Sequence, residues 1–274
     1  MARTGPTLRA LSLGAGLQST TLALMAAHGE LGVIPDCAIF ADTQWEPAAV
    51  YEHLQWLESD NVLPFPIHRV TAGSLRESIV NKATGAKGRF AAVPFFTSDG
   101  GMGRRQCTRE FKLEPITRML RELLGVPHGR RVPAGVRVEV WIGISTDEIF
   151  RVKPARHRWQ TNRWPLVEKR MSRWDCRRWL ERHGYPVPPK SSCIGCPYHS
   201  DALWRDMRDT APHEWADAVE VDRLIRAGGT LRGMRQQQFM HPSRVPLDRV
   251  DLSTPADRGQ IDLFQNECEG LCGV

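Results

Sequence analysis

Two cysteines three positions apart carry a clear chemical signal in this sequence. Cys193 and Cys196 form a Cys-x-x-Cys pair that encloses Gly195 and precedes Pro197, so the pair lies in a loop rather than in a packed helix. Thiolates at this spacing are ligands for soft metals, and both zinc and iron–sulfur chemistry stay open. In a chain with the odd number of seven cysteines, the pair indicates metal or redox chemistry before a structural disulfide.

A loop of small residues, Ser12 to Thr20, is the second chemical signal, and it reads Ser-Leu-Gly-Ala-Gly-Leu-Gln-Ser-Thr. Between a strand and a helix, such residues let backbone N–H groups converge on an anion, and the helix N-terminus adds partial positive charge. The hydroxyl groups of Ser12, Ser19 and Thr20 can add hydrogen bonds. The loop lacks the Gly-Lys-Ser/Thr of a Walker loop and the last glycine of the dinucleotide fingerprint. It indicates a phosphate site of another type, with a tight turn that binds no ligand as the alternative.

A third polar segment, Gly143 to Arg151, follows the most apolar predicted strand. Open parallel sheets place their ligand-binding residues at such strand ends. Arg151 and Lys153 are candidates for holding a polyphosphate, and Asp147 or Glu148 for binding Mg²⁺. The alternative is that these charges cap and solvate a loop.

The elements that must position these residues alternate between strand and helix patterns. Apolar runs predict strands at 8–13, 37–41, 67–70 and 136–144. Periodic segments predict helices at 18–28, 48–57 and 108–124. This alternation is typical of βαβ units, so we expect an α/β fold with a parallel sheet of five strands flanked by helices. Cys37 lies on a predicted strand and Cys176 on a predicted helix capped by Ser172, and we interpret both as core residues. The glycine-rich segment 83–103 predicts a surface loop over the site.

Composition narrows the class of protein. Of the 274 residues, 41% are apolar and 25% are charged, which suits a globular fold and excludes a disordered chain. No stretch reaches the ~18 apolar residues of a membrane span, and no signal-peptide pattern opens the chain. We therefore expect a cytoplasmic protein with no membrane partner.

The basic residues gather in the second half of the chain. Twelve Lys and Arg lie within 151–190 against three acidic residues, and four tryptophans share part of this stretch, at positions 159, 164, 174 and 179. The cations and aromatic rings of 151–182 can hold a tRNA or DNA backbone and stack on its bases. Trp174 and Trp179 equally suit the core of a small helical lobe. We expect a nucleotide-binding domain over 1–150 and a basic, cysteine-containing region over 151–274 that packs on the same core.

The phosphate loop resembles that of the PP-loop ATP pyrophosphatases and of the sulfonucleotide (APS/PAPS) reductases that share their fold. Their loop reads Ser-Gly-Gly-x-Asp-Ser, and Gly14 to Ser19 is similar to it, with Gln18 in place of the aspartate. Phe40 to Pro47 is similar to the segment that lines the nucleotide there, although Asp42 and Glu46 could instead cap the next helix. The resemblance implies an adenine nucleotide α-hydrolase-like fold, and ATP held by Ser12, Gly14, Ala15, Gly16, Gln18, Ser19, Thr20, Asp42 and Arg151.

The cysteine segments resemble the same reductases. Cys107 to Ile116 is similar to their Cys-Cys-x-x-x-Lys-x-x-Pro segment, with Thr108 where the second cysteine would be and Lys112 at the lysine. Four cysteines hold a [4Fe–4S] cluster in those enzymes, which implies Cys107, Cys193 and Cys196 as ligands here. The fourth ligand is Cys268, Cys272 or none, and the last case leaves one iron open. Residues 266–272 are also similar to the reductases' terminal segment, whose cysteine attacks sulfur.

The resemblance implies an enzyme that uses ATP and Mg²⁺ to adenylate a nucleobase carbonyl, and then inserts sulfur from a sulfur donor by means of the cluster. Lys112, Asp147, Cys268 and Cys272 are its candidate catalytic residues. One alternative is a sulfonucleotide reductase with Cys268 as nucleophile. Another is a zinc-stabilised module that binds nucleic acid. The acceptor and the oligomeric state stay open.

Overall fold

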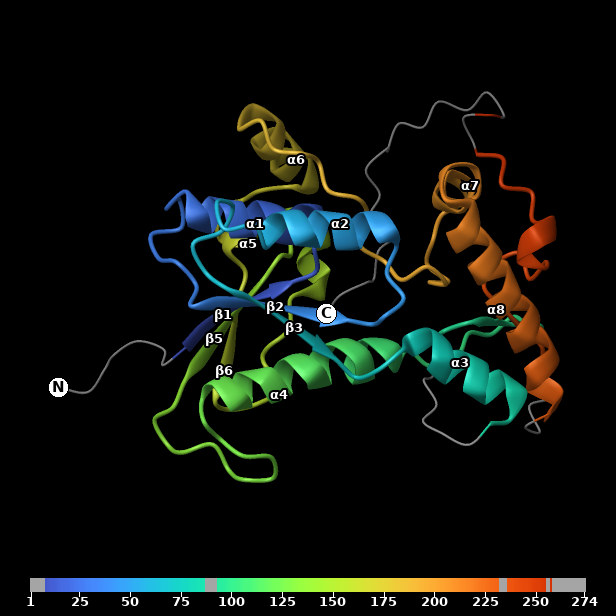
Figure 1. The fold of residues 1–274 in the computed structure, drawn as a ribbon, viewed down its shortest axis with the longest axis horizontal. Coiled ribbons are helices and arrows are strands. Elements are labelled where there is room, and N and C mark those ends of the chain that lie inside the picture. Colours follow the sequence, from blue (N-terminus) through green and yellow to red (C-terminus); the bar gives the residue numbers. More distant parts are fainter. Residues whose placement is uncertain (1–7, 87–92, 232–235, 255–256, 258–274) are drawn as a thin grey trace.

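The computed structural model describes residues 8–86, 93–231, 236–254 and 257. Its centre is a five-stranded sheet in the order β3-β2-β1-β5-β6, with every neighbouring pair parallel. Figure 1 shows this sheet between two layers of helices. The strands are β1 (Leu8–Leu13), β2 (Cys37–Asp42), β3 (Ile67–Thr71), β5 (Val138–Ile142) and β6 (Gln160–Arg163). The expected α/β class and five-stranded parallel sheet are confirmed.

The central strands are apolar on both faces, because successive side chains point to opposite sides of a sheet. On β1, Leu11 and Leu13 join the core under α1 (Leu17–Ala27) and α2 (Ala48–Leu57), whereas Ala10 joins the core on the other face. There, Ile116 and Leu120 of α4 (Glu114–Leu123) pack against the sheet. Both faces of the central strands are therefore closed to water, which leaves the sheet's edges and strand ends for ligands.

The strand order reverses between β1 and β5, which are neighbours in the sheet although two strands of the same sheet separate them in the sequence. At such a reversal, the connections leave to opposite faces and open a crevice at the carboxyl ends of the strands. The loop before α1 follows β1, and the segment from Gly143 to Arg151 follows β5. The topology thus places both predicted polar segments at one crevice.

A second apolar cluster lies beside the sheet and holds the cysteine loops. It contains Trp45, Phe111, Ile194 and Trp204, together with residues of α3 (Leu75–Thr84), α7 (Asp201–Thr210) and α8 (Pro212–Leu231). In Figure 1, α3, α7 and α8 stand together at the end of the sheet that β3 borders. Buried Asp222 of α8 fixes this part, since it pairs with Arg226 and accepts backbone hydrogen bonds from Met240 (2.9 Å) and Leu247 (3.0 Å).

Several sequence expectations need correction in detail. The helix expected over 108–124 is a π-helical turn, η1 (Thr108–Leu113), that runs into α4. Segment 83–103 is not wholly a loop, because β4 (Phe96–Thr97) pairs with β7 (Gln238–Phe239). Trp179 is buried in the core as one reading expected, whereas the side chain of Trp174 is half exposed. The remaining elements are η2 (Thr146–Arg151), α5 (Pro165–Glu168), α6 (Arg173–Arg182) and η3 (Leu247–Arg249).

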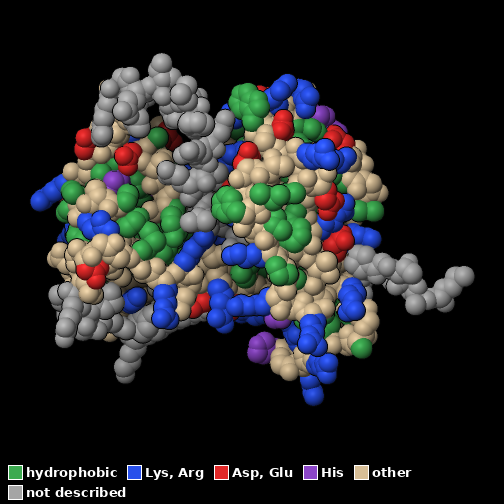
Figure 2. Space-filling view, turned by 180° about the vertical axis from the view of Figure 1, so that it is seen from behind, with side chains coloured by type: hydrophobic (Ala, Val, Ile, Leu, Met, Phe, Trp, Pro, Cys, Tyr) green, Lys and Arg blue, Asp and Glu red, His purple; other side chains and the backbone are tan. Residues whose placement is uncertain are grey.

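The basic stretch is divided between two places. Residues 160–163 form β6, the fifth strand of the central sheet, so the sheet continues past residue 150. The domain boundary at that residue stays a prediction. Helix α6 packs on α1 through Cys176, Trp179 and Leu180. Figure 2 shows Lys and Arg side chains gathered along the lower part of one face, over the loop that follows α4. In the described part of the chain, no helix has the length and apolar character needed to cross a membrane.

Candidate functional site

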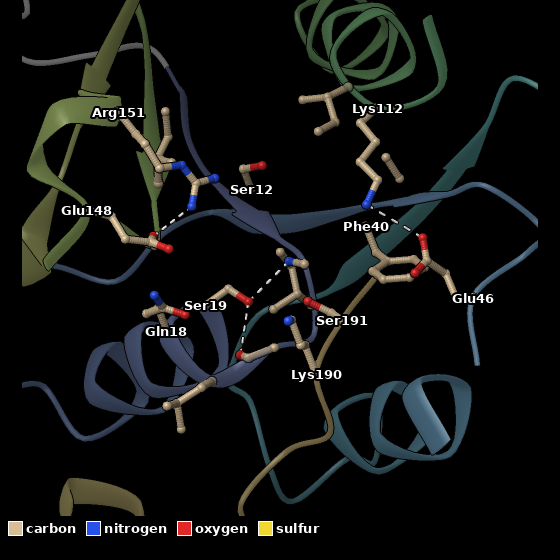
Figure 3. Close-up of a pocket in the computed structure, with 18 of the residues that line it drawn as sticks. Ser12, Gln18, Ser19, Phe40, Glu46, Lys112, Glu148, Arg151, Lys190 and Ser191 are labelled. Carbon is tan, nitrogen blue, oxygen red and sulfur yellow. Dashed lines mark hydrogen bonds and ion pairs between the residues drawn. The ribbon is translucent and has the colours of Figure 1, made fainter. Parts of the chain in front are cut away.

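The phosphate loop is folded by its own polar atoms. Ser19 Oγ accepts a hydrogen bond from the amide of Gly14 (3.2 Å) and donates one to the carbonyl of Gly16 (3.2 Å), as the dashed lines in Figure 3 show. Ala15 has a positive φ of 53°, which is uncommon for a residue with a side chain. These bonds bring the loop directly to the N-terminus of α1, the end whose partial positive charge favours an anion.

Two glycines let neighbouring segments approach this loop. A Cβ atom on Gly143, just after β5, would lie 2.9 Å from the backbone nitrogen of Ser19. A Cβ atom on Gly16 would lie 2.5 Å from the hydroxyl of Ser191. Glycine is required at position 143 for the end of β5 to meet the loop, because the backbone of Ser19 cannot easily move, whereas at position 16 the Ser191 hydroxyl would have to turn away.

A cavity of ≈ 110 Å³ lies at this meeting point. The phosphate loop, the ends of β2 and β5, and Ser191 contribute to its wall. Its lining also brings together four cations, Lys112, Arg151, Arg173 and Lys190, and two carboxylates, Glu46 and Glu148. Figure 3 shows Lys112, Arg151 and Lys190 around the loop, each from a different segment of the chain. The arrangement suits a ligand with several negative charges.

Two of these cations are held in place by neighbours. Arg151 pairs with the buried carboxylate of Glu148 at 2.7 Å. Arg173 donates a hydrogen bond from Nη1 to Gln18 Oε1 (3.2 Å), and Gln18 Nε2 lies 3.5 Å from Ser145 Oγ. Gln18, which replaces an acidic residue in the family resemblance, therefore connects the loop to the start of α6 without adding negative charge to the cavity.

Glu46 lies at the wall between the cavity and the cysteines, and its side chain is only 2% exposed. Its Oε1 accepts a hydrogen bond from Thr43 Oγ1 (3.0 Å), lies 3.6 Å from Lys112 Nζ and lies 3.5 Å from Cys193 Sγ. Among the described residues, its other oxygen, Oε2, is buried with no hydrogen-bond partner. Through these contacts Glu46 connects Lys112 to the cysteine loop.

The three predicted metal ligands line one cavity of ≈ 40 Å³, together with Thr108 and Lys112. Lys112 thus belongs to the walls of both cavities. The cysteine loop is seated by a hydrogen bond from the amide of Ile194 to the carbonyl of Trp45 (2.8 Å). A Cβ atom on Gly195 would lie 2.0 Å from the Trp45 ring, so the loop can lie against this ring only with glycine at that position.

Burial keeps His199, Cys37 and Cys176 neutral. Within the described ranges, no group of three or more His, Cys, Asp or Glu side chains is arranged to hold a metal ion. Burial, reinforced by Lys190, lowers the pKa of His199 to about 3, and the ring bonds Ser192 Oγ through Nε2 (2.8 Å). Burial raises the pKa of Cys37 to about 11 and that of Cys176 to about 12. The last two are core thiols, as expected from the sequence, and are chemically inert.

Comparison with known proteins gives similarity at the level of structure. No protein-family model matches the sequence, and no curated protein matches it. The chain is similar in structure to a phosphoadenylyl-sulfate (PAPS) reductase from Candida auris, solved as a phosphate complex. The two chains are 15% identical, the match covers 68% of this chain and 76% of the other, and the TM-score is 0.42. We therefore infer function from the side chains of the site itself.

Several residues predicted from the sequence line the two cavities and others do not. Ser12, Gly14, Gly16, Gln18, Ser19, Arg151 and Lys112 line the first cavity. Thr20 instead bonds His53 (3.0 Å), and Ala15 is buried in the core. Asp42 Oδ1 accepts hydrogen bonds from Gln44 N (2.7 Å) and Tyr51 (2.8 Å), and Asp147 accepts one from the amide of Arg173. Cys268 and Cys272 lie outside the described residues.

Sequence reasoning did not assign four residues of the cavity wall. Arg173 lies in the basic stretch 151–190, and the Ser172–Asp175 capping box that fixes the start of α6 is the signal that could have placed it. Lys190 and Ser191 precede the cysteine pair, and their nearness to it is the signal that could have found them. Glu46 was considered as a helix cap, but the amide of Ala48 donates to Glu214 instead (2.7 Å).

Proposed function

We propose that this protein is a nucleotide-activating sulfur-transfer enzyme. It would bind the phosphate groups of ATP in the cavity at the phosphate loop and use the cysteine cavity beside it to deliver sulfur. The observation that carries the proposal is that Lys112 lines both cavities, so a phosphate group and a sulfur atom can lie on either side of one ammonium group. Glu46, close to both Lys112 and Cys193, supports the same coupling.

The first step needs positioning and charge neutralisation rather than covalent catalysis. The carbonyl oxygen of the acceptor base attacks the α-phosphorus of ATP, the bond to the β-phosphate oxygen breaks, and pyrophosphate leaves. Backbone amides at the start of α1 and the four cations of the cavity stabilise the charge that develops on the phosphoryl oxygens. Mg²⁺ would accompany the ATP, and Glu148 is its candidate ligand because one buried oxygen, Oε1, has no hydrogen-bond partner among the described residues.

In the second step, a sulfide sulfur attacks the activated carbon and AMP leaves with the former carbonyl oxygen. Cys107, Cys193 and Cys196 line one cavity, but they are not arranged as the ligands of a single metal ion. An iron–sulfur cluster accepts thiolates that lie farther apart, because they bind different irons. They fit a single zinc ion less well, since zinc requires its sulfurs at about 2.3 Å from one centre. Such a cluster, held by Cys107, Cys193 and Cys196, would supply the sulfide, with Thr108 leaving one position open.

Isothermal titration with ATP and Mg²⁺ tests the proposal. We expect wild-type protein to bind ATP and Lys190→Gln to bind it about tenfold more weakly, because a charged hydrogen-bond partner of the phosphates is lost. Arg182→Gln is the matched control, since this arginine lies on the outer part of α6 and bonds the carbonyl of Arg178. Wild-type protein that binds no ATP, or Lys190→Gln that binds it as wild-type does, contradicts the proposal.

A second candidate is the reduction of a sulfonucleotide. The observation in its favour is the set of four cations, which suits a nucleotide that carries a sulfate and an additional phosphate. A thiolate, Cys268 in this candidate, would attack the sulfur, the nucleotide phosphate would leave, and a thiol reductant would release sulfite. Competition between ATP and a sulfonucleotide for the same cavity separates the two, because the enzyme binds its own substrate more tightly. Failure to bind either nucleotide would favour the zinc-stabilised nucleic-acid-binding module.

A further inference from the structure

A wide groove opens beside the nucleotide cavity. Its volume is ≈ 1120 Å³, against ≈ 110 Å³ for the cavity itself. Its walls come from η1 and α4, from the loop around His128, and from the segment between Phe150 and Trp164. Ser12, Arg151 and three apolar residues line both spaces, so the groove leads directly to the phosphate loop.

The groove has a strong positive charge. Eight cations line it, against a single acidic residue, Glu114. Glu114 pairs with Arg109 at 3.0 Å and Arg151 pairs with Glu148. The eight are Arg105, Arg109, Arg118, Arg121, Arg130, Arg151, Lys153 and Arg156.

Half of these eight cations have no acidic counterpart in the part of the chain that the structure describes. Among the described residues, Arg118, Arg130, Lys153 and Arg156 are exposed and form no ion pair with a carboxylate. The pKa of His157 in the same wall is lowered by burial and by the nearby charges of Arg156 and Arg121. Unpaired cations repel one another, so a groove of this kind costs free energy unless an anion binds there.

The size and the aromatic wall indicate a polymer. Pockets for small molecules occupy about 300 to 1,000 Å³, and this groove exceeds that range. The side chain of Phe150, next to Arg151, is 71% exposed, so its ring is accessible to a ligand in the groove. Bases of single-stranded nucleic acid stack on such rings while cations follow the backbone.

We propose that this groove binds a single strand of nucleic acid and delivers one of its bases to the nucleotide cavity. The inference rests on the proposed function for the reaction, but the groove itself stands on its own charge and shape. A single strand fits better than a duplex, because the carbonyl of a base in a duplex is stacked and paired and cannot reach a recessed site. The sequence predicts nucleic-acid binding by residues 151–182, and the structure divides this stretch between the groove and α6.

Fluorescence anisotropy with a labelled oligonucleotide longer than the groove tests this proposal on the full chain. Single-stranded RNA, single-stranded DNA and a duplex form three arms, each titrated between about 50 and about 200 mM salt. The groove variant combines Arg118→Gln, Arg130→Gln and Arg156→Gln. Its matched control combines Arg177→Gln, Arg178→Gln and Arg182→Gln on the exposed part of α6, which does not line the groove.

We expect wild-type protein to bind one of the single strands, and the preferred strand identifies the sugar. The groove variant should bind at least tenfold more weakly at the lowest salt, with a log–log salt slope about 2 units flatter, since each lost contact on a single strand removes about 0.7. The α6 variant should match wild-type. Phe150→Ala should weaken binding roughly tenfold without changing the slope, because stacking releases no counterions.

Four results would overturn the groove proposal: no binding of any single strand, equal losses in the two triple variants, tighter binding of the duplex, or displacement by polyglutamate as effective as by the oligonucleotide. If the groove variant proves unfolded by circular dichroism, Arg130→Glu alone and Phe150→Ala carry the test. ATP titration of wild-type protein is separate. Strand binding without ATP binding would refute the proposed function and leave the groove proposal standing. ATP binding without strand binding would refute the groove proposal and leave the proposed function standing.

Discussion

Lys112 Nζ lies 3.6 Å from Oε1 of Glu46, and the Glu46 side chain is almost completely buried, whereas Lys112 is partly exposed. Lys112 lines both the nucleotide cavity and the cysteine cavity, and Glu46 lines the nucleotide cavity. Removing one member of a buried pair leaves a charge that the interior cannot solvate, whereas removing both can be nearly neutral. This asymmetry allows the structural and the ligand-binding roles of Lys112 to be separated.

The first prediction uses that separation. Lys112→Met should lower the free energy of unfolding by roughly 1–3 kcal/mol and weaken ATP binding about tenfold. The double variant Glu46→Gln with Lys112→Met should regain most of the stability but not the ATP affinity. Urea denaturation and isothermal titration measure the two effects. ATP affinity that returns with stability would mean that Lys112 does not contact the nucleotide.

The second prediction concerns the approach of β5 to the phosphate loop. Gly143→Ala should destabilise the protein by roughly 1–3 kcal/mol, because its Cβ would lie 2.9 Å from the backbone nitrogen of Ser19 and the backbone cannot easily yield. Gly14→Ala is the control for stability, since its Cβ would meet only side-chain oxygens at 3.7 Å. Thermal unfolding compares the two. Equal melting temperatures would show that the loop and the strand end are not in close contact.

The third prediction is a loss of stability in acid that depends on buried histidines. Burial lowers the pKa of His53 from 6.5 to about 4, and that of His199 from 6.5 to about 3. Both side chains bind protons in the unfolded state at a pH where the native state does not, so stability is complete above about pH 6.5 and falls as the pH decreases. Each contributes about 1.4 kcal/mol per pH unit well below pH 6.5, until its native pKa is reached.

His53→Gln should remove the contribution of His53 to the pH dependence of the free energy of unfolding. His53 lies outside the lining of both cavities and bonds Thr20 at 3.0 Å, so the variant tests stability apart from ligand binding. Urea denaturation at about pH 7.5 and about pH 5 gives the slope for both proteins. An identical slope in wild-type and variant would place the titrating groups elsewhere.

The fourth prediction concerns the cysteines. After anaerobic reconstitution with iron and sulfide, wild-type protein should retain iron, and Cys107→Ala, Cys193→Ala and Cys196→Ala should each lose it, because each removes a thiolate ligand. Cys268→Ala and Cys272→Ala should retain it. Iron and zinc content, with the visible absorption spectrum, are the readouts. Iron loss in Cys268→Ala or Cys272→Ala would mean that the site has a fourth thiolate and no open iron.

The sequence by itself determined the class of fold and the local geometry of the loop. Apolar runs separated by helical patterns required βαβ units, and the run from Gly14 to Ser19 required a turn at a helix N-terminus, because both follow from the residues within one segment. The capping box of Ser172 and Asp175 is likewise present, with both hydrogen bonds formed. Such features depend on neighbours a few positions away, which a sequence shows directly.

Only the tertiary structure decided which distant residues meet. Placing β5 beside β1 brings Arg151 and Glu148 to the phosphate loop, and packing α6 on α1 brings Arg173 to Gln18. Glu46 reaches Lys112 and Cys193 because the cysteine loop is seated on Trp45. A charge looks the same in sequence whether it is solvated or buried against a partner far along the chain. The role of such a charged residue depends on which segments the strand order and helix packing bring next to it, and no local sequence pattern shows this.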